Sequence, residues 1–148
     1  MSTLVDLILL VEDNPADAWL FQRALRKAGV SVPVVRVANG DDALAYLQGD
    51  APYDNRAQYP APGIMVLDLK LPRRSGFEVL EWVRRLSTGL RLLPVVVLSS
   101  SSMPTDVNRA YDLGANSYLT KPHESARFVT LASAFKEYWL TVNEDPVF

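Results

Sequence analysis

The sequence has no cysteine and almost no charge imbalance, and each of these shortages excludes a class of function. Without cysteine, its 148 residues form no disulfide, thiolate metal site or cysteine nucleophile. The single histidine, His123, cannot form a histidine-based metal site by itself. Fifteen basic against seventeen acidic residues give a net charge of −2, which argues against a nucleic-acid-binding surface. No apolar run reaches the length of a membrane span, and the N-terminus lacks the basic stretch of a signal peptide.

What is present is the composition of a globular protein, with 49% hydrophobic and 22% charged residues. A chain of this length fits one compact domain and buries about two thirds of its unfolded surface. We therefore expect one soluble, cytoplasmic domain over residues 1–148. Its core is expected at about residues 5–140, followed by a short tail at 141–148.

Short apolar runs of strand length alternate with segments of helical periodicity. The expected strands cover residues 7–11, 34–37, 63–67, 95–98 and 117–120. The last helix shows an apolar stripe from Phe128 to Val142 that includes Tyr138 and Trp139. A polar stretch at 48–62 with three prolines is predicted to be a long loop. Five βα units in alternation predict an α/β fold, a doubly wound parallel sheet with helices on both faces.

Charged and hydroxyl side chains follow four of the expected strands: Glu12 and Asp13, Asp68, Ser99, and Lys121. In such sheets ligands bind at the carboxyl ends of the strands, so these residues are expected to converge. Three carboxylates close together need a cation, and Mg²⁺ prefers such oxygen ligands. A metal ion, a nucleophilic carboxylate, an ammonium and a hydroxyl together suit phosphoryl transfer. Any one of them alone would be a helix cap or a solvated loop residue, but their joint placement favours function.

Other polar residues are interpreted as structural. Asp17, Asp41 and Asp42 are predicted to be helix-start acids near positive dipole ends. His123 is predicted to lie at the start of the last helix without a chemical role. The arginine pairs at 73–74 and 84–85 are expected on solvated faces.

At the strand-end residues, the sequence resembles the receiver domain of two-component response regulators over about residues 5–140. The matching segments are LLVEDN at 9–14, VLDLKLP at 66–72 with Gly76, PVVVLS at 94–99, and YLTKP at 118–122. The resemblance implies a five-stranded flavodoxin-like sheet of order 2-1-3-4-5. It implies a phosphoacceptor that catalyses its own phosphorylation and dephosphorylation rather than a conventional enzyme.

The resemblance also implies a role for each strand-end residue. Asp68 would accept a phosphoryl group from a sensor histidine kinase. Glu12, Asp13, Asp68 and the backbone carbonyl of Lys70 would bind Mg²⁺. A lysine at position 70 departs from the small polar residue often found there, so the dephosphorylation rate is left open.

The remaining implied roles concern switching. Ser99 would be the hydroxyl that turns toward the phosphoryl group, and Tyr118 the aromatic residue that follows it inward. Ser100 is an alternative hydroxyl, but the spacing from Pro94 and Lys121 favours Ser99. Lys121 would pair with the acyl phosphate, and a cis peptide bond would precede Pro122.

The long loop and the C-terminal tail resemble one subgroup, the stand-alone regulators paired with phytochrome-type kinases of bacteria. The resemblance implies a homodimer formed through the fourth helix, fifth strand and fifth helix. The candidate interface residues are Tyr111, Tyr118, Trp139, Leu140 and Val142. The alternative is that Trp139 folds back onto the core of its own chain. With no room for a DNA-binding domain after the last helix, the signal is expected to pass to another protein or back to the kinase.

Three other functions fit the sequence less well. An aspartyl-phosphate hydrolase of the haloacid dehalogenase type needs a second aspartate at position 70, where this chain has lysine. A flavodoxin-like cofactor binder needs a phosphate-binding loop after the first strand, where this chain has Glu-Asp-Asn-Pro. A degenerate receiver that acts only as a protein-interaction module is disfavoured by the intact set of strand-end residues.

Overall fold

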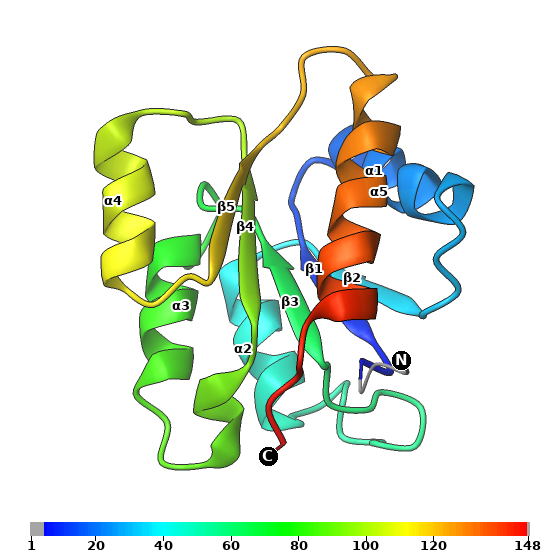
Figure 1. Ribbon diagram of the computed structural model, residues 1–148. Coiled ribbons are helices and arrows are strands. Elements are labelled where there is room, and N and C mark those ends of the chain that lie inside the picture. Colours follow the sequence, from blue (N-terminus) through cyan, green and yellow to red (C-terminus); the bar gives the residue numbers. More distant parts are fainter. Residues whose placement is uncertain (1–4, 148) are drawn as a thin grey trace.

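The chain folds around one five-stranded parallel sheet (Figure 1). The structure is a computed structural model that describes residues 5–147. The strands are β1 (Ile8–Val11), β2 (Val34–Val37), β3 (Ile64–Leu67), β4 (Val95–Ser99) and β5 (Ser117–Thr120). They lie in the order β2-β1-β3-β4-β5, all parallel, which confirms the predicted topology.

Helices cover both faces of the sheet. They are α1 (Pro15–Lys27), α2 (Gly40–Gln48), α3 (Gly76–Arg84), α4 (Pro104–Asp112) and α5 (Arg127–Glu137). In Figure 1, α1 and α5 lie together on one face, and α2, α3 and α4 lie on the other. None of the helices within residues 5–147 has the length and apolar character that a membrane span requires.

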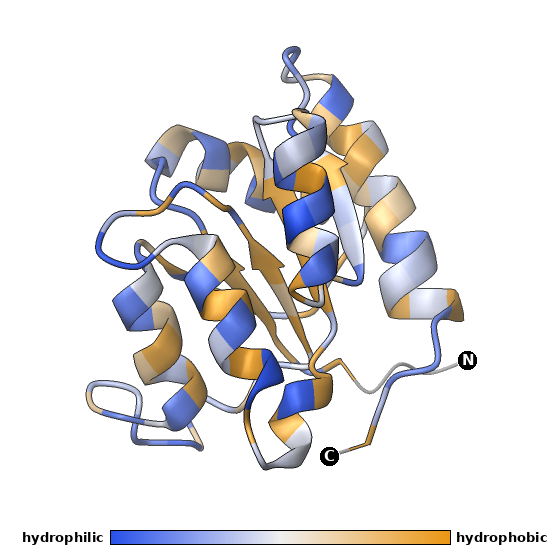
Figure 2. Cartoon of the chain, turned by 90° about the vertical axis from the view of Figure 1, so that its left-hand side faces the viewer, coloured by the Kyte–Doolittle hydropathy of each residue, from blue (hydrophilic) through white to orange (hydrophobic). Residues whose placement is uncertain are grey.

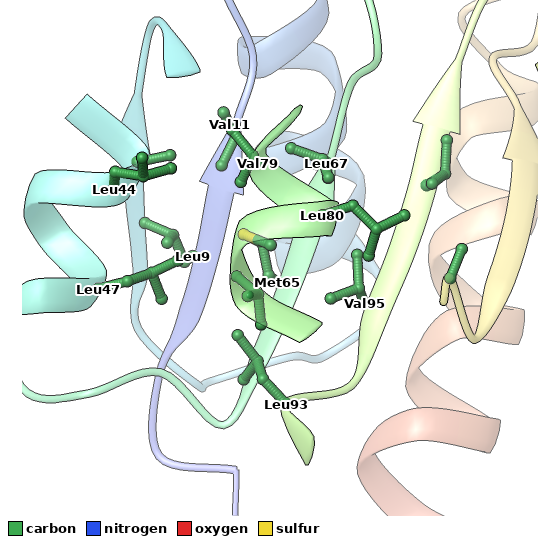
Figure 3. Packing of buried hydrophobic residues seen from close by; sticks show 14 of the residues in the cluster. Leu9, Val11, Leu44, Leu47, Met65, Leu67, Val79, Leu80, Leu93 and Val95 are labelled. Atoms are coloured by element: carbon green, nitrogen blue, oxygen red, sulfur yellow. The ribbon is translucent and has the colours of Figure 1, made fainter. Parts of the chain in front are cut away.

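The hydrophobic core consists of two layers separated by the sheet. Successive strand residues point to opposite faces, so Leu9 and Met65 pack toward α2 and α3 (Figure 3). Their neighbours Ile8 and Ile64 pack toward α1 and α5. The central strands β1 and β3 are therefore buried on both faces, which explains why every residue in them is hydrophobic, whereas the helices carry hydrophobic and hydrophilic residues in turn (Figure 2).

Side-chain caps begin the three helices that follow β1, β2 and β3. Asn14 Oδ1 accepts hydrogen bonds from the backbone N–H groups of Ala16 and Asp17 at the start of α1. Asn39 caps α2 in the same way. Ser75 and Glu78 form a reciprocal capping box at α3. These caps fix the short loops that carry the strand-end residues.

The predicted loop after α2 is irregular but ordered by its side chains. Tyr53 and Tyr59 stack against the buried Tyr46, whose hydroxyl donates to the carbonyl of Pro60. The guanidinium of Arg56 lies over the Tyr46 ring and donates to the carbonyls of Leu47 and Tyr59. The loop is thereby fixed to the end of α2, away from the carboxyl edge of the sheet.

The predicted apolar stripe of the last helix is wrong at Tyr138 and Val142, whereas Trp139 packs against the core as predicted. A π-helical turn, Tyr138–Val142, follows α5 and inserts an extra residue per turn, which rotates the side chains that follow. Val142, at the end of this turn, is consequently 56% exposed, whereas Leu140 is buried in the core. Tyr138, at the start of the turn, is 52% exposed.

The predicted environment of Arg84 is also wrong. Instead of lying on a solvated face, its guanidinium donates to the carbonyls of Gly114, Arg91 and Leu93 and to the Asn116 side chain. Burial lowers the pKa of this guanidinium. Arg84 therefore ties the end of α3 to the segments that precede β4 and β5.

Candidate functional site

The structure brings Glu12, Asp13 and Asp68 together at the carboxyl edge of the sheet. One carboxylate oxygen from each lies within 4.8 Å of the others. Glu12 and Asp13 directly follow β1, and Asp68 directly follows the adjacent strand β3. Glu12 and Asp68 are buried, whereas Asp13 is exposed. The topology of the sheet, with β1 and β3 paired, explains this convergence.

Lys121, after β5, reaches into the same cluster. Its ammonium lies 2.6 Å from Glu12 Oε1 and 2.9 Å from Asp68 Oδ2. The side chain is only 9% exposed, and so is that of Asp68. The ammonium is therefore the internal counter-charge of these buried carboxylates, as a buried charge requires.

The other oxygens of these carboxylates are also paired. Asp68 Oδ1 accepts a hydrogen bond of 2.7 Å from the backbone N–H of Leu69. Glu12 Oε2 accepts one of 3.1 Å from the backbone N–H of Asn14. No buried side-chain nitrogen or oxygen within the described residues is left unpaired. The buried carboxylates of the site thus have hydrogen-bond partners for both of their oxygens.

The electrostatics of the cluster indicate a shortage of positive charge. Burial, together with the negative charge of Asp68, raises the pKa of Glu12 to about 7 despite its hydrogen bond with Lys121. Burial disfavours the Lys121 ammonium, but its hydrogen bonds to Glu12, Asp17 and Asp68 outweigh this and raise its pKa. One ammonium holds its proton firmly, yet it does not fully compensate the carboxylates around it.

These residues fit a hard divalent cation. Three carboxylates that can each offer an oxygen to one point form a donor set of the type that Mg²⁺ and Mn²⁺ prefer. A bound cation would also add positive charge beside the Glu12 carboxylate, whose pKa burial raises to about 7. Lys70, whose carbonyl is the fourth predicted ligand, is exposed, and its role as a ligand stays a prediction.

Asp17, interpreted from the sequence as a helix-start acid only, belongs to this cluster. Its Oδ2 lies 2.9 Å from Lys121 Nζ, from a position in the first turn of α1. The Asn-Pro pair before it starts the helix directly after β1, so the first turn lies at the site. The sequence pattern predicts that Asp17 lies at the start of a helix. It does not predict the contact with Lys121, because that lysine lies about a hundred residues later in the chain.

A second missed residue, Arg36 of β2, supports the acidic pair through the backbone. Its guanidinium donates to the carbonyls of Glu12, at 2.9 Å, and Asp13, at 3.2 Å. The strand pairing of β1 with β2 places it there. No motif in the sequence distinguishes this arginine from the others.

Gly76 explains why the segment after Asp68 closes so tightly. Its backbone N–H donates to the carbonyl of Leu69, and a Cβ atom at this position would collide with the carbonyl of Asp68. Only glycine therefore allows the start of α3 to approach the backbone next to the Asp68 carboxylate.

Ser99 and Tyr118 lie on the β4 and β5 side of the site and are joined through Ser101. The backbone N–H of Ser101 donates to Ser99 Oγ at 3.2 Å, and its carbonyl accepts from the Tyr118 hydroxyl at 2.7 Å. The Ser101 hydroxyl donates to Asp106 of α4. Ser99 is buried and Ser100 exposed, which favours Ser99 among the candidate hydroxyls. Four consecutive serines concealed the role of Ser101 in the sequence.

The candidate interface residues are only partly at the surface. Tyr111 and Val142 are exposed, and Tyr118 and Trp139 are half-buried. Leu140 lies in the core of its own chain. Between β5 and α5 there is an apolar groove of about 660 Å³, which is lined by side chains that include Leu119, Phe135 and Trp139.

Two further expectations concern the segment that follows β5, at Pro122 and His123. The peptide bond before Pro122 is trans, contrary to the prediction, and within residues 5–147 the cis peptide bond is Ala51–Pro52. Trans is the favoured form of most such bonds. His123 is exposed and lies ahead of α5, outside the carboxylate cluster.

Fold and site together define an α/β signalling domain with an acidic pocket and a lysine at the carboxyl edge of its sheet. The family model described as "Response regulator receiver domain" matches residues 8–133. The chain therefore belongs to the response regulator receiver family, whose members are phosphoacceptor signalling proteins rather than conventional enzymes.

Two relatives with different printed names match most of the chain. The chain is 39% identical over 140 residues to "Probable methanogenesis regulatory protein FilR2" of Methanothrix harundinacea, covering 95% of this chain and 87% of that protein. It is 35% identical to Response regulator Rcp1 of Synechocystis over 133 residues, covering 90% of this chain and 88% of that protein.

Solved structures share the whole fold. The phosphorylated cyanobacterial phytochrome response regulator RcpA superimposes with a TM-score of 0.88 at 38% identity, covering 97% of this chain and 99% of that one. The Mn²⁺-bound form of Rcp1 superimposes with a TM-score of 0.86 at 34% identity, covering 96% and 99%. These likenesses extend across the carboxylate cluster and α5.

Proposed function

We propose that this protein is a stand-alone response regulator that accepts a phosphoryl group on Asp68 from a sensor histidine kinase. The observation that carries the proposal is the position of Asp68, whose carboxylate belongs to the triad and also lies 2.9 Å from the Lys121 ammonium. Only this carboxylate is paired with Lys121 and also lies at the end of the central strand β3. The protein is proposed to act in the cytoplasm.

The proposed transfer uses the groups already in place. An Asp68 carboxylate oxygen attacks the phosphorus of a phosphohistidine, so that a P–O bond forms and the P–N bond breaks. The electron pair of the broken bond returns to the imidazole nitrogen of the kinase. Lys121 stabilises the negative charge on the phosphoryl oxygens. Glu12, Asp13 and Asp68 would hold a divalent cation, which would supply further positive charge.

The direct test is the intact mass of the protein after incubation with a small phosphoryl donor. We expect a gain of one phosphoryl group with Mg²⁺, and none with a chelator or in Asp68→Asn. Asp41→Asn is the matched control, because it removes an exposed helix-start carboxylate that pairs with Arg74. No gain under any condition would instead favour the degenerate receiver, which acts only as a protein-interaction module.

Switching is proposed to use Ser99 and Tyr118. A phosphoryl group on Asp68 offers new acceptor oxygens, toward which the buried Ser99 hydroxyl can turn. The turn breaks the hydrogen bond between Ser101 N–H and Ser99 Oγ, and Tyr118 follows because its hydroxyl is held by the same residue. Fluorescence or NMR of Tyr118 should change on phosphorylation in the wild type but not in Ser99→Ala.

A phytochrome-type kinase is the proposed source of the phosphoryl group. The support is similarity over nearly the full length to RcpA and Rcp1, of which RcpA is described as a phytochrome response regulator. FilR2 is equally similar and belongs to another pathway, so similarity alone does not decide the input. Transfer from a purified phytochrome kinase, compared with an unrelated histidine kinase, tests this part of the proposal.

A homodimer through α4, β5 and α5 is proposed as the output surface. Tyr111, Tyr138 and Val142 are exposed hydrophobic side chains on this side, next to the apolar groove between β5 and α5. Analytical ultracentrifugation of Val142→Asp and Tyr138→Ser should show a weaker dimer than the wild type. Trp19→Ser is the matched control, because it removes a similarly exposed aromatic residue from α1.

A further inference from the structure

Asp17 is the third carboxylate partner of Lys121, and it comes from a different element than the other two. Lys121 Nζ lies 2.6 Å from Glu12, 2.9 Å from Asp68 and 2.9 Å from Asp17. An ammonium has three hydrogens to donate, so each carboxylate can take one. Lys121 is therefore fully hydrogen-bonded by these three residues.

The three partners differ in their relation to the metal triad. Glu12 and Asp68 belong to the group of carboxylates that could hold a metal ion, together with Asp13. Asp17 is outside that group, within the part of the chain that the structure describes. A cation would compete with Lys121 for Glu12 and Asp68, whereas its competition for Asp17 would be weak.

Asp17 is also held independently of the triad. The Asn14 side chain accepts hydrogen bonds from the backbone N–H groups of Ala16 and Asp17, which fixes the first turn of α1. The helix itself packs on α5, and the chain that leads into α5 contains Lys121. The Asp17 carboxylate, 31% exposed, can therefore keep its place when the buried carboxylates change partners.

We propose that Asp17 is a positioning residue that holds the Lys121 ammonium beside Asp68 when Glu12 leaves the lysine to bind a metal ion. The inference rests on the proposed function, because it assumes that the triad binds a divalent cation. With Asp17 present, Lys121 keeps two carboxylate partners in the metal-bound state. Without it only one is left, so the metal-bound state is disfavoured.

A helix-start acid has a simpler role, which the experiment must separate from this one. A first-turn carboxylate stabilises a helix through the dipole, and Asp17 would do so whether or not it touched Lys121. Asp42 in the first turn of α2 provides the comparison, because its carboxylate bonds to the Asn39 side chain and to no lysine. Asp42→Asn therefore controls for the loss of a helix-start charge.

The test is Mn²⁺ affinity, measured by electron paramagnetic resonance on the full chain. We expect Asp17→Asn to weaken binding about fivefold and Asp42→Asn less than about twofold. Asp17→Glu keeps a carboxylate and should stay within about twofold of the wild type. In a Lys121→Gln background, Asp17→Asn should change the affinity less than about twofold, because the residue acts through the lysine. Urea unfolding of each variant checks that the fold is kept.

Each contrary result has a distinct meaning. If Asp17→Asn binds Mn²⁺ as tightly as the wild type, Asp17 does not position Lys121. An equal loss in the wild-type and Lys121→Gln backgrounds would show that Asp17 acts by its own charge, which also overturns the inference. A wild type that binds no Mn²⁺ would overturn the proposed function as well, whereas the first two results leave it intact.

Discussion

Two halves of the same sheet edge are held together by different forces. In the acidic half, defined as Glu12, Asp13, Asp68 and Lys121, short ion pairs to Lys121 hold the buried carboxylates of Glu12 and Asp68. In the hydroxyl half, Ser99 and Tyr118 are each held by one neutral hydrogen bond to the backbone of Ser101. A neutral bond contributes about 1 kcal/mol, whereas separating a buried ion pair costs several times more. The acidic half is thus suited to bind and react, and the hydroxyl half to rearrange.

The largest effect is expected where the acidic half loses its only ammonium. Lys121→Met leaves Glu12 and Asp68 buried without a cationic partner, and we expect a loss of about 3 kcal/mol in the free energy of unfolding. Mg²⁺ should restore much of this loss, because the ion supplies the missing charge. Urea unfolding with and without Mg²⁺ measures both effects.

Lys136→Met is the matched control for Lys121→Met. Lys136 donates to the carbonyl of Ala28 and bonds to no carboxylate in the structure. Its loss should cost about 1 kcal/mol and should not respond to Mg²⁺. If both variants lose the same stability and neither responds to the ion, the acidic half is not held by charge.

A second test leaves every charge in place and changes only the backbone next to Asp68. Gly76→Ala places a Cβ atom against the Asp68 carbonyl, so the start of α3 must move. We expect a loss of about 2 kcal/mol in the free energy of unfolding and a lower yield of phosphorylation. Gly63→Ala, at the opposite end of β3, controls for the general cost of filling a glycine site and should leave phosphorylation unchanged.

A smaller effect should appear as a dependence of metal affinity on pH. Burial raises the pKa of Glu12 to about 7 in the metal-free protein, and a carboxylate must lose its proton to bind a cation. Mn²⁺ affinity should therefore fall about tenfold between pH 8 and pH 6. In Glu12→Gln the affinity should be weaker at pH 8 and nearly independent of pH over this range. If the Mn²⁺ affinity of Glu12→Gln depended on pH as strongly as that of the wild type, the group that titrates would not be Glu12.

The sequence predicts the acidic half far better than the hydroxyl half, for a physical reason. Glu12, Asp13, Asp68 and Lys121 each follow a strand, and a parallel sheet must bring the ends of its strands to one edge. The topology therefore implies their meeting. The role of Ser101 depends instead on how one loop folds back on β4 and β5, which no periodicity or spacing encodes.

The sequence patterns also did not predict contacts between elements that lie far apart along the chain. Asp17 meets Lys121, and Arg84 meets Gly114, only because helices pack beside distant segments. The π-helical turn after α5 could not be predicted either, and its extra residue per turn reversed the exposure expected for Val142. Local patterns determine which elements form, but tertiary packing determines which of their polar groups become partners.

The smallest expected effect lies in the hydroxyl half and completes the comparison. Tyr118→Phe removes one hydroxyl and its hydrogen bond to Ser101, at a half-buried position. We expect a loss of about 0.5–1 kcal/mol in the free energy of unfolding, with Mn²⁺ affinity and phosphorylation yield unchanged. Because the carbonyl of Ser101 is then free of its partner, hydrogen exchange of the loop that follows β4 should become faster. If Tyr118→Phe instead lowered metal affinity as strongly as Asp17→Asn, the two halves would form one network rather than two.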